Sequence, residues 1–139
     1  MRQAVQGFFD LCTGCRICEL VCSSKKYGFY DPKNARIEIA TEHNGLASIP
    51  RLCQQCEEPF CLKSCPFNAI VRDENNGIVR VLFEKCTGCG TCTKACPIQG
   101  AIKIEKTSNK AIKCDLCEGD PKCIKFCPTG AIKLIKLGA

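Results

Sequence analysis

The sequence lacks long apolar runs and targeting segments. No window approaches the roughly 18 consecutive apolar residues of a membrane-spanning helix. The first ten residues contain neither the apolar segment of a secretory signal nor a twin-arginine pair. We therefore expect no membrane span, no secretion and a cytoplasmic location.

Residues for catalysis, nucleotide binding and nucleic-acid binding are also scarce. His43 is the only histidine, and we interpret it as a loop residue. The glycines do not form a dinucleotide-binding fingerprint, and aromatic residues are not interleaved with the lysines as in a stacking nucleic-acid surface. A local basic run, which we interpret as a solvated strand face and turn or else a docking site for an acidic partner, comprises Lys103, Lys106, Lys110 and Lys113.

The ordinary apolar core must be small. Hydrophobic residues make up 45% of the 139 residues, but 16 of them are cysteine. Other apolar side chains therefore amount to about a third of the chain, which suits a single domain or two very small ones. Something besides side-chain burial must hold such a fold together.

What the sequence has in abundance is cysteine at regular spacing. The cysteines form four quartets that each end in Cys-x3-Cys, and none is left over. The quartets are Cys12, Cys15, Cys18, Cys22; Cys53, Cys56, Cys61, Cys65; Cys86, Cys89, Cys92, Cys96; and Cys114, Cys117, Cys123, Cys127. In a reducing cytoplasm this pattern favours metal binding over disulfides.

The first and third quartets are compact, as LCTGCRICELVC and KCTGCGTCTKACP. Three cysteines within seven residues can wrap one loop around an iron-sulfur cube, whereas tetrahedral zinc more often takes two separated Cys-x2-Cys pairs. The sequence therefore predicts four [4Fe-4S] clusters, with zinc and disulfides as the alternatives. A cluster core of about +2 with four thiolates carries about −2, so four clusters would change the formal charge of +6 to about −2, and the basic composition does not argue for nucleic acid.

The second and fourth quartets have wider loops. Pro59 and Pro121 stand two residues before the third cysteine, which fits a rigid turn. Prolines also follow the last cysteine of the second, third and fourth quartets, as in bacterial ferredoxins. Ser23 follows Cys22 instead, so the first quartet departs from this pattern.

The segment between Cys65 and Cys86 indicates how the quartets pair. Two β-rich stretches, residues 69–72 and 78–83, flank Asn76 and Gly77, which is a strong hairpin signal. This is the linker of a two-cluster ferredoxin, so quartets two and three are expected to form one unit, and quartets one and four the other. Pairing of adjacent quartets, one with two and three with four, is the rival scheme.

The motifs together resemble the four-cluster, polyferredoxin-like electron-transfer subunits of anaerobic oxidoreductases. The resemblance rests on LCTGCRICELVCS, the Pro-x2-Ala-Arg-Ile stretch at residues 32–37, CQQCEEPFCLKSCP and the two further quartets. It implies a molybdenum or tungsten type of enzyme as partner, and the chain most resembles the small subunit of a tungsten-dependent aldehyde oxidoreductase. Hydrogenase, formate dehydrogenase and carbon monoxide dehydrogenase are the other partner types.

The resemblance also implies a ligand set for each cluster. The first set is Cys12, Cys15, Cys18 and Cys127; the second is Cys22, Cys114, Cys117 and Cys123; the third is Cys53, Cys56, Cys61 and Cys96; and the fourth is Cys65, Cys86, Cys89 and Cys92.

The expected fold class is α+β, with two ferredoxin-like two-cluster lobes, one inserted in the other. The outer lobe comprises residues 1–49 and 105–139, and the inserted lobe residues 50–104. Short strands are expected around residues 4–10, 36–40, 101–105 and 131–137, and helical turns at residues 17–22 and 91–96. Because the clusters act as structural metals, we expect the chain without them to be largely unfolded.

Sixteen cysteines for four clusters leave no iron open for a substrate, so we expect no catalytic activity. The expected function is a relay of single electrons between a catalytic oxidoreductase subunit and a second redox protein. A free, diffusible polyferredoxin is the alternative, and an iron-sulfur regulator is a third class. Tyr27, Phe29 and Tyr30 form either a partner-facing surface or a cover for the clusters. Gly14 and Gly88 are expected to let the backbone approach a cluster closely.

Overall fold

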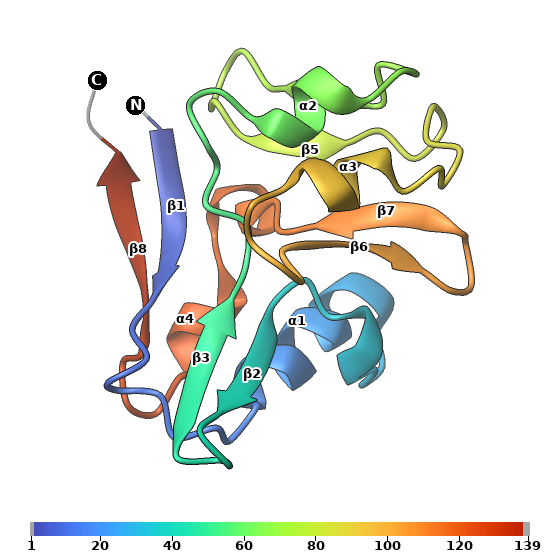
Figure 1. Ribbon diagram of the computed structural model, residues 1–139. Helices are drawn as coiled ribbons and strands as arrows, with labels where there is room; N and C mark the ends of the chain where they lie inside the picture. The colour runs from blue at the N-terminus through green and yellow to red at the C-terminus, as the bar shows by residue number, and fades with distance from the viewer. Residues whose placement is uncertain (1, 138–139) are drawn as a thin grey trace.

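The computed structural model describes residues 2–137, which form short helices and four two-stranded antiparallel sheets (Figure 1). The strands are β1 (Arg2–Gly7), β2 (Glu38–Glu42), β3 (Ala47–Arg51), β4 (Ile70–Arg72), β5 (Val79–Val81), β6 (Ile102–Glu105), β7 (Lys110–Lys113) and β8 (Ile132–Leu137). The α-helices are α1 (Ile17–Tyr27), α2 (Phe60–Ser64), α3 (Thr91–Ala95) and α4 (Lys122–Phe126), and the 3-10 helices are η1 (Pro32–Asn34) and η2 (Leu116–Gly119). The expectation of short strands and short helices is confirmed.

The chain folds back on itself so that its first and last strands pair. β1 pairs with β8 in antiparallel register, with Arg2 opposite Leu137 and Gly7 opposite Ile132. The other three sheets are hairpins of consecutive strands. Among the helices, α1 packs against α4, and α2 packs against α3 (Figure 1). Quartet one is thereby brought beside quartet four, and quartet two beside quartet three.

The residue after the last cysteine of each quartet decides how long its helix runs. α2, α3 and α4 end just before Cys65, Cys96 and Cys127, and these three residues have extended backbone angles. A proline follows each of them, and proline pushes the preceding residue out of the helical region. Ser23 follows Cys22 and imposes no such restriction, so α1 continues to Tyr27. The predicted turn at residues 17–22 is therefore a full helix.

The predicted hairpin between Cys65 and Cys86 is confirmed, although both strands are shorter than expected. β4 pairs with β5, and the loop between them is closed by a bond from the Gly77 N–H to the Asp73 carbonyl (2.8 Å). Gly77 has φ +73°, a left-handed conformation that glycine adopts without a steric cost. The Asn76 side chain accepts a hydrogen bond from the Ile78 N–H (2.9 Å) and fixes the turn.

Other strand boundaries shift for local reasons. The first strand ends at Gly7 because the chain turns there, with the Leu11 N–H bonded to the Phe8 carbonyl (3.1 Å). The strand expected at residues 36–40 begins at Glu38, since the Arg36 N–H is bonded to the sulfur of Cys22 (3.2 Å). β3 and β7 were not predicted, and each completes a hairpin with the strand before it.

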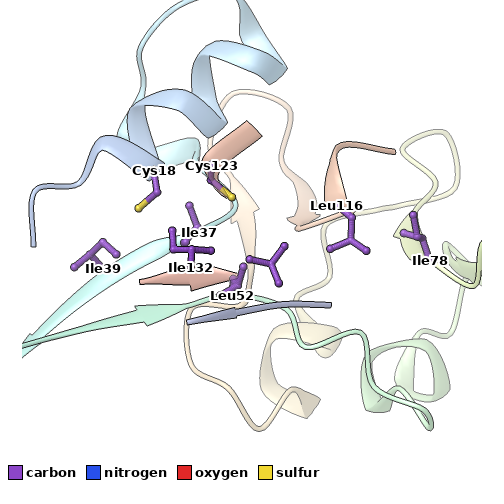
Figure 2. Close-up of a cluster of buried hydrophobic side chains, with 9 residues drawn as sticks. Cys18, Ile37, Ile39, Leu52, Ile78, Leu116, Cys123 and Ile132 are labelled. Atoms are coloured by element: carbon purple, nitrogen blue, oxygen red, sulfur yellow. The ribbon is translucent and has the colours of Figure 1, made fainter. Parts of the chain in front are cut away.

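Two separate groups of buried side chains form the core. The first includes Val5, Cys18, Ile37, Ile39, Leu52, Ile78, Leu116, Cys123 and Ile132. The second includes Cys61, Ile70, Val79, Cys92, Ile102 and Ala111. Figure 2 shows Cys18 and Cys123 projecting from two helices toward the aliphatic side chains of the first group. Cysteine is thus part of both cores.

Aromatic side chains contribute little to these cores. Among the described residues no aromatic side chain is fully buried, and Phe9, Phe29, Tyr30, Phe60 and Phe126 are more than half exposed. Small aliphatic cores of this kind bury little apolar area, so they stabilise the fold only modestly. None of the helices within residues 2–137 is long and apolar enough to cross a membrane.

Candidate iron-sulfur sites

The sixteen cysteines line four hollows, with four thiols at each. One hollow is lined by Cys12, Cys15, Cys18 and Cys127; a second by Cys22, Cys114, Cys117 and Cys123; a third by Cys53, Cys56, Cys61 and Cys96; and a fourth by Cys65, Cys86, Cys89 and Cys92. Each contains about 290 to 400 Å³ of unfilled space, part of it open to solvent. These hollows bring together the same fours as the ligand sets that the resemblance implies.

Every hollow combines three cysteines of one quartet with one of another. The packing of α1 against α4 brings Cys127 to the first hollow and Cys22 to the second. The packing of α2 against α3 brings Cys96 to the third and Cys65 to the fourth. None of these four hollows mixes quartets one and two, or three and four, as the rival scheme would require.

The residue just before the second cysteine of each quartet takes a left-handed conformation. In the compact quartets it is Gly14 (φ +77°) or Gly88 (φ +78°). A Cβ on Gly88 would lie 2.0 Å from the Asn109 carbonyl oxygen, so the close approach there requires glycine. In the wider quartets the same position is Gln55 (φ +50°) or Leu116 (φ +59°), and both side chains are 1% exposed. Burial of these side chains offsets the backbone cost that glycine avoids.

Backbone amides donate hydrogen bonds to cysteine sulfurs in the second, third and fourth hollows. These bonds include Arg36 to Cys22 (3.2 Å), Gln55 to Cys53 (3.4 Å), Ala69 to Cys65 (3.4 Å), Ala111 to Cys86 (3.3 Å) and Leu116 to Cys114 (3.4 Å). Such amides favour the thiolate over the thiol, and around iron-sulfur centres they also influence the reduction potential. Gln55 and Leu116 were not singled out from sequence, because the spacing of cysteines does not show which amides face the sulfurs.

Burial raises the pKa of several of the thiols and so favours their neutral form. It raises the pKa of Cys18 to about 12, with a further rise from the nearby Glu19 carboxylate. It raises the pKa of Cys92 to about 11 and also raises the pKa of Cys123. For Cys127 burial is outweighed by backbone hydrogen bonds from residues such as Thr129, and its pKa is lowered. The buried thiolates therefore need a strong positive charge beside them, which a metal centre supplies.

The chemistry of the donors fits a cluster rather than a single ion. Among residues 2–137, no three or more Cys, His, Asp or Glu side chains are grouped so that they could hold one metal ion. All sixteen cysteines are free rather than joined in disulfides. Four thiols spread around a hollow match an iron-sulfur cube, whose four irons each take one thiolate, better than tetrahedral zinc.

Exposure differs between the four sites. Cys15 of the first hollow and Cys89 of the fourth are exposed, whereas every cysteine of the second and third hollows is buried or half-buried. His43 lies in the exposed turn between β2 and β3 with φ +53°, which confirms its interpretation as a loop residue. Lys113 was interpreted as part of a solvated strand face, and this was wrong, since only 4% of it is exposed.

Two known protein families match different segments of the chain, and each match contains cysteine quartets. The family described as "4Fe-4S dicluster domain" matches residues 45–137, well over half of the chain. The family described as "4Fe-4S binding domain" matches residues 9–28. The two matches together span all four quartets.

Two curated relatives are named as subunits of oxidoreductases. The chain is 41% identical over 81 residues to the "Aliphatic sulfonate oxidoreductase, polyferredoxin-like subunit" of Pyrococcus furiosus, over 58% of this chain and 46% of that protein. It is 30% identical over 94 residues to the "Menaquinone reductase, iron-sulfur cluster-binding subunit" of Nitratidesulfovibrio vulgaris, over 58% of this chain and 37% of that protein. The match covers less than half of each relative.

The fold also has a counterpart among solved structures. A chain of the active site complex BamBC of benzoyl coenzyme A reductase aligns with a TM-score of 0.59 and 24% identity, over 99% of this chain and 80% of that one. This likeness concerns the fold alone. From the cysteine grouping and the match over residues 45–137, the chain belongs to the 4Fe-4S dicluster domain family.

Proposed function

We propose that the chain holds four [4Fe-4S] clusters, one in each hollow, and relays single electrons between a catalytic oxidoreductase subunit and a second redox protein. The observation that carries the proposal is that each of the four hollows is lined by four cysteines, with none left over. When bound, each cluster would accept and release one electron at a time.

The residues around each hollow have complementary roles in this proposal. The cysteines of the first to fourth sets hold the metal as thiolates, and the backbone amides that face their sulfurs stabilise that charge. Aliphatic side chains such as Ile39, Ile70 and Ile102 line the hollows and exclude water. Exclusion of water and a fixed set of hydrogen bonds together set the potential at each site.

The route of the electron follows from exposure and from order along the fold. The first and fourth sets each have an exposed cysteine, Cys15 and Cys89, so we assign them to the two ends of the relay. The second and third sets lie between them, with the Gln55 side-chain amide donating to the Cys114 carbonyl (3.0 Å). The outer lobe of residues 1–49 and 105–139 and the inserted lobe of residues 50–104 belong to the same proposal, although β6 and β7 form one hairpin across that boundary.

The chain's own role in the proposal is not catalytic. Four thiolates occupy the four irons of a cube, so no position remains for a substrate. The catalytic subunit is proposed to be of the tungsten aldehyde oxidoreductase type, with hydrogenase, formate dehydrogenase or carbon monoxide dehydrogenase as other candidates. Support for a subunit comes from the names of the relatives. A cytoplasmic, anaerobic setting is part of this proposal.

Iron analysis tests the cofactor content. Protein isolated or reconstituted without oxygen should contain about sixteen irons and as many sulfides per chain, four for each cluster. Cys89→Ala should remove or convert one cluster and leave the other three visible by low-temperature EPR. The exposed neighbour Lys85 offers the matched control, since Lys85→Ala should keep all four. Far fewer than sixteen irons in the unaltered protein would contradict the proposal.

Purification of the native protein tests the partner. A tagged chain expressed at its natural level and isolated without oxygen should elute with a catalytic subunit that contains tungsten or molybdenum. An isolated monomer that exchanges electrons with several unrelated enzymes would show a free polyferredoxin instead.

A further inference from the structure

Lys113 is a lysine whose side chain is buried inside the fold. It is the last residue of β7 and is 4% exposed. Its ammonium donates hydrogen bonds to the carbonyl oxygens of Val79 and of Cys114, the latter at 3.1 Å. Within residues 2–137 it forms no ion pair with a carboxylate. The two buried acids are already engaged, Glu19 with Arg16 and Glu105 with the hydroxyls of Tyr27 and Thr107.

Gln55 is bonded to the same two carbonyl groups as Lys113. Its side-chain nitrogen donates to Cys114 (3.0 Å) and to Val79 (3.4 Å), and its side-chain oxygen accepts from the Val79 N–H (2.7 Å). Gln55 is 1% exposed and lies in the loop of the second quartet. The two side chains therefore tie this loop, β5 and the start of the fourth quartet into one hydrogen-bonded junction.

This junction lies between two of the cysteine-lined hollows. Lys113 itself lines the hollow of the third set. It precedes Cys114, which lines the hollow of the second set and whose carbonyl it contacts. Each of these sets has four thiols that become thiolates when metal binds, and each reduction adds one more negative charge.

A buried ammonium without a carboxylate is costly unless some other negative charge compensates it. Hydrogen bonds to two carbonyl groups satisfy two of its three N–H donors but do not neutralise its charge. Three further carboxylates line a cavity with Lys113, but Asp115 is paired with Lys26, Asp73 is paired with Arg80, and Glu118 is exposed. The buried negative charge that remains beside Lys113 is that of the two ligand sets. The same attraction acts in the other direction, because a fixed positive charge favours the reduced, more negative form of any centre beside it.

We propose that Lys113 is the shared counter-charge of the second and third sets, and that it raises the reduction potentials of these two central sites relative to the first and fourth. Gln55 is a positioning residue that fixes the two carbonyl groups to which the ammonium is bonded. The inference rests on the proposed function, because it needs clusters in both hollows. Electrons would thus cross between the two cysteine units beside a buried cation.

Redox titration of the holo-protein followed by EPR tests this inference. Lys113→Met keeps the length of the side chain without its charge, and it should move two of the four midpoint potentials to more negative values. We expect at least a tenfold change in each reduction equilibrium, which is about 59 mV for one electron. The other two potentials should stay in place. Lys113→Arg should keep all four near their original values.

Lys136→Met on β8 is the matched control, because that lysine is exposed and the same loss of charge there is screened by water. Its four potentials should equal those of the unaltered protein. If Lys113→Met leaves all four potentials unchanged, or shifts all four equally, the inference is overturned.

Two further variants keep the test decisive if Lys113→Met binds less iron. Gln55→Glu places a negative charge against Lys113 and should lower the same two potentials. Gln55→Leu removes the hydrogen bonds without changing the charge and should shift them less. Equal shifts in these two variants would overturn the counter-charge and indicate a structural role alone. Iron content of the unaltered protein is measured separately, so a failure of the proposed function is recognised by low iron and not by unshifted potentials.

Discussion

The α1–α4 region and the α2–α3 region gather their cysteines in the same way, but they differ in how much helix, strand and ion pairing stabilises them. α1 has 11 residues and packs against α4, which in turn contacts β8 of the six-residue pair β1 and β8. It also forms a half-buried ion pair between Lys26 and Asp115 (2.6 Å). α2 and α3 have five residues each, and β4 and β5 have three. A larger share of the stability of the α2–α3 region must therefore come from bound metal.

Removal of the metal should give the largest effect and should separate the two regions. Without clusters the buried thiols are protonated, the hollows have nothing to fill them, and the small cores cannot hold the fold alone. We expect the apo-protein to be largely unfolded. Hydrogen exchange should be fastest at α2, α3 and the β4–β5 hairpin, with whatever protection persists found in the β1–β8 sheet.

Mass spectrometry of hydrogen exchange before and after chelation would check this. Apo-protein that still unfolds cooperatively, or that protects α2 better than β1, would break the comparison.

Exchanging serine and proline at the position after the last cysteine of a quartet should show why the helices differ in length. Ser23→Pro would push Cys22 out of the helical region, end α1 before it and remove an N–H from the helix interior, at a cost of about 3 kcal/mol or more. It would also remove the bond from the Asp31 N–H to the Ser23 hydroxyl (3.0 Å). The midpoint of denaturant unfolding of the holo-protein measures this loss.

Pro97→Ser is the matched control after the third quartet. There α3 has already ended at Ala95, so the change should cost less than about 1 kcal/mol. Equal losses in the two variants would mean that proline does not set the helix lengths.

Three glycines in the loops of the compact quartets should differ in how much stability is lost when each is replaced by alanine, because an added Cβ meets different neighbours at each. Gly88→Ala should be the most damaging, since its Cβ meets a backbone oxygen at 2.0 Å. Gly14→Ala meets the movable Ser48 hydroxyl at 2.6 Å and should cost less. Gly90→Ala has no contact closer than 3.8 Å and should cost only the left-handed backbone strain, about 1 to 2 kcal/mol. The thermal midpoints of the three holo-proteins measure the order, and a reversed order for Gly88 and Gly90 would contradict it.

Loss of the Lys26–Asp115 pair should have the smallest effect. Burial would raise the pKa of Asp115, but the ammonium of Lys26 more than offsets it, so the folded pKa is lowered. The pair therefore stabilises the fold at neutral pH, and that contribution is lost as the pH falls through the lowered pKa. Lys26→Met should cost about 1 kcal/mol at neutral pH, because the pair is partly exposed, and should weaken the decline of stability as the pH falls.

Lys122→Met is its control, because the ion pair of Lys122 with Asp120 is exposed and should contribute nothing measurable. Thermal unfolding measured from neutral pH to below the ordinary Asp pKa of about 4 compares the two variants. If Lys26→Met left the dependence of stability on pH unchanged, the Lys26–Asp115 pair would not stabilise the fold.

Much of the fold was predictable because local signals and the cysteine pattern agree. Asn76 and Gly77 are a turn signal between two β-rich stretches, which predicts a hairpin, and β4 and β5 form that hairpin. The hollows combine the cysteines in the fours that the resemblance implied, and cluster binding by each four is what we propose. The sequence also held the signal for the length of α1, since Ser23 stands where the other three quartets have proline. Only comparison with the three shorter helices shows that the missing proline lets α1 continue.

The rest depends on contacts between distant segments. Lys113 looks like one more lysine of a basic run, and only the packing of β7 against the loop of Gln55 buries it. β3 and β7 were missed because short strands without strong alternation are stabilised by their hairpin partners. The amides that face the sulfurs are likewise set by left-handed backbone at Gln55 and Leu116, residues that seldom adopt it.

The most direct test of the central claim is a crystal structure of the holo-protein with anomalous diffraction at the iron edge. The account predicts four iron peaks, one in each hollow, with the cluster near Cys22 also bound by Cys114, Cys117 and Cys123. It predicts that the cluster near Cys96 is bound by the first three cysteines of the second quartet. Fewer than four peaks, or a cluster that joins Cys22 to the second quartet, would contradict it.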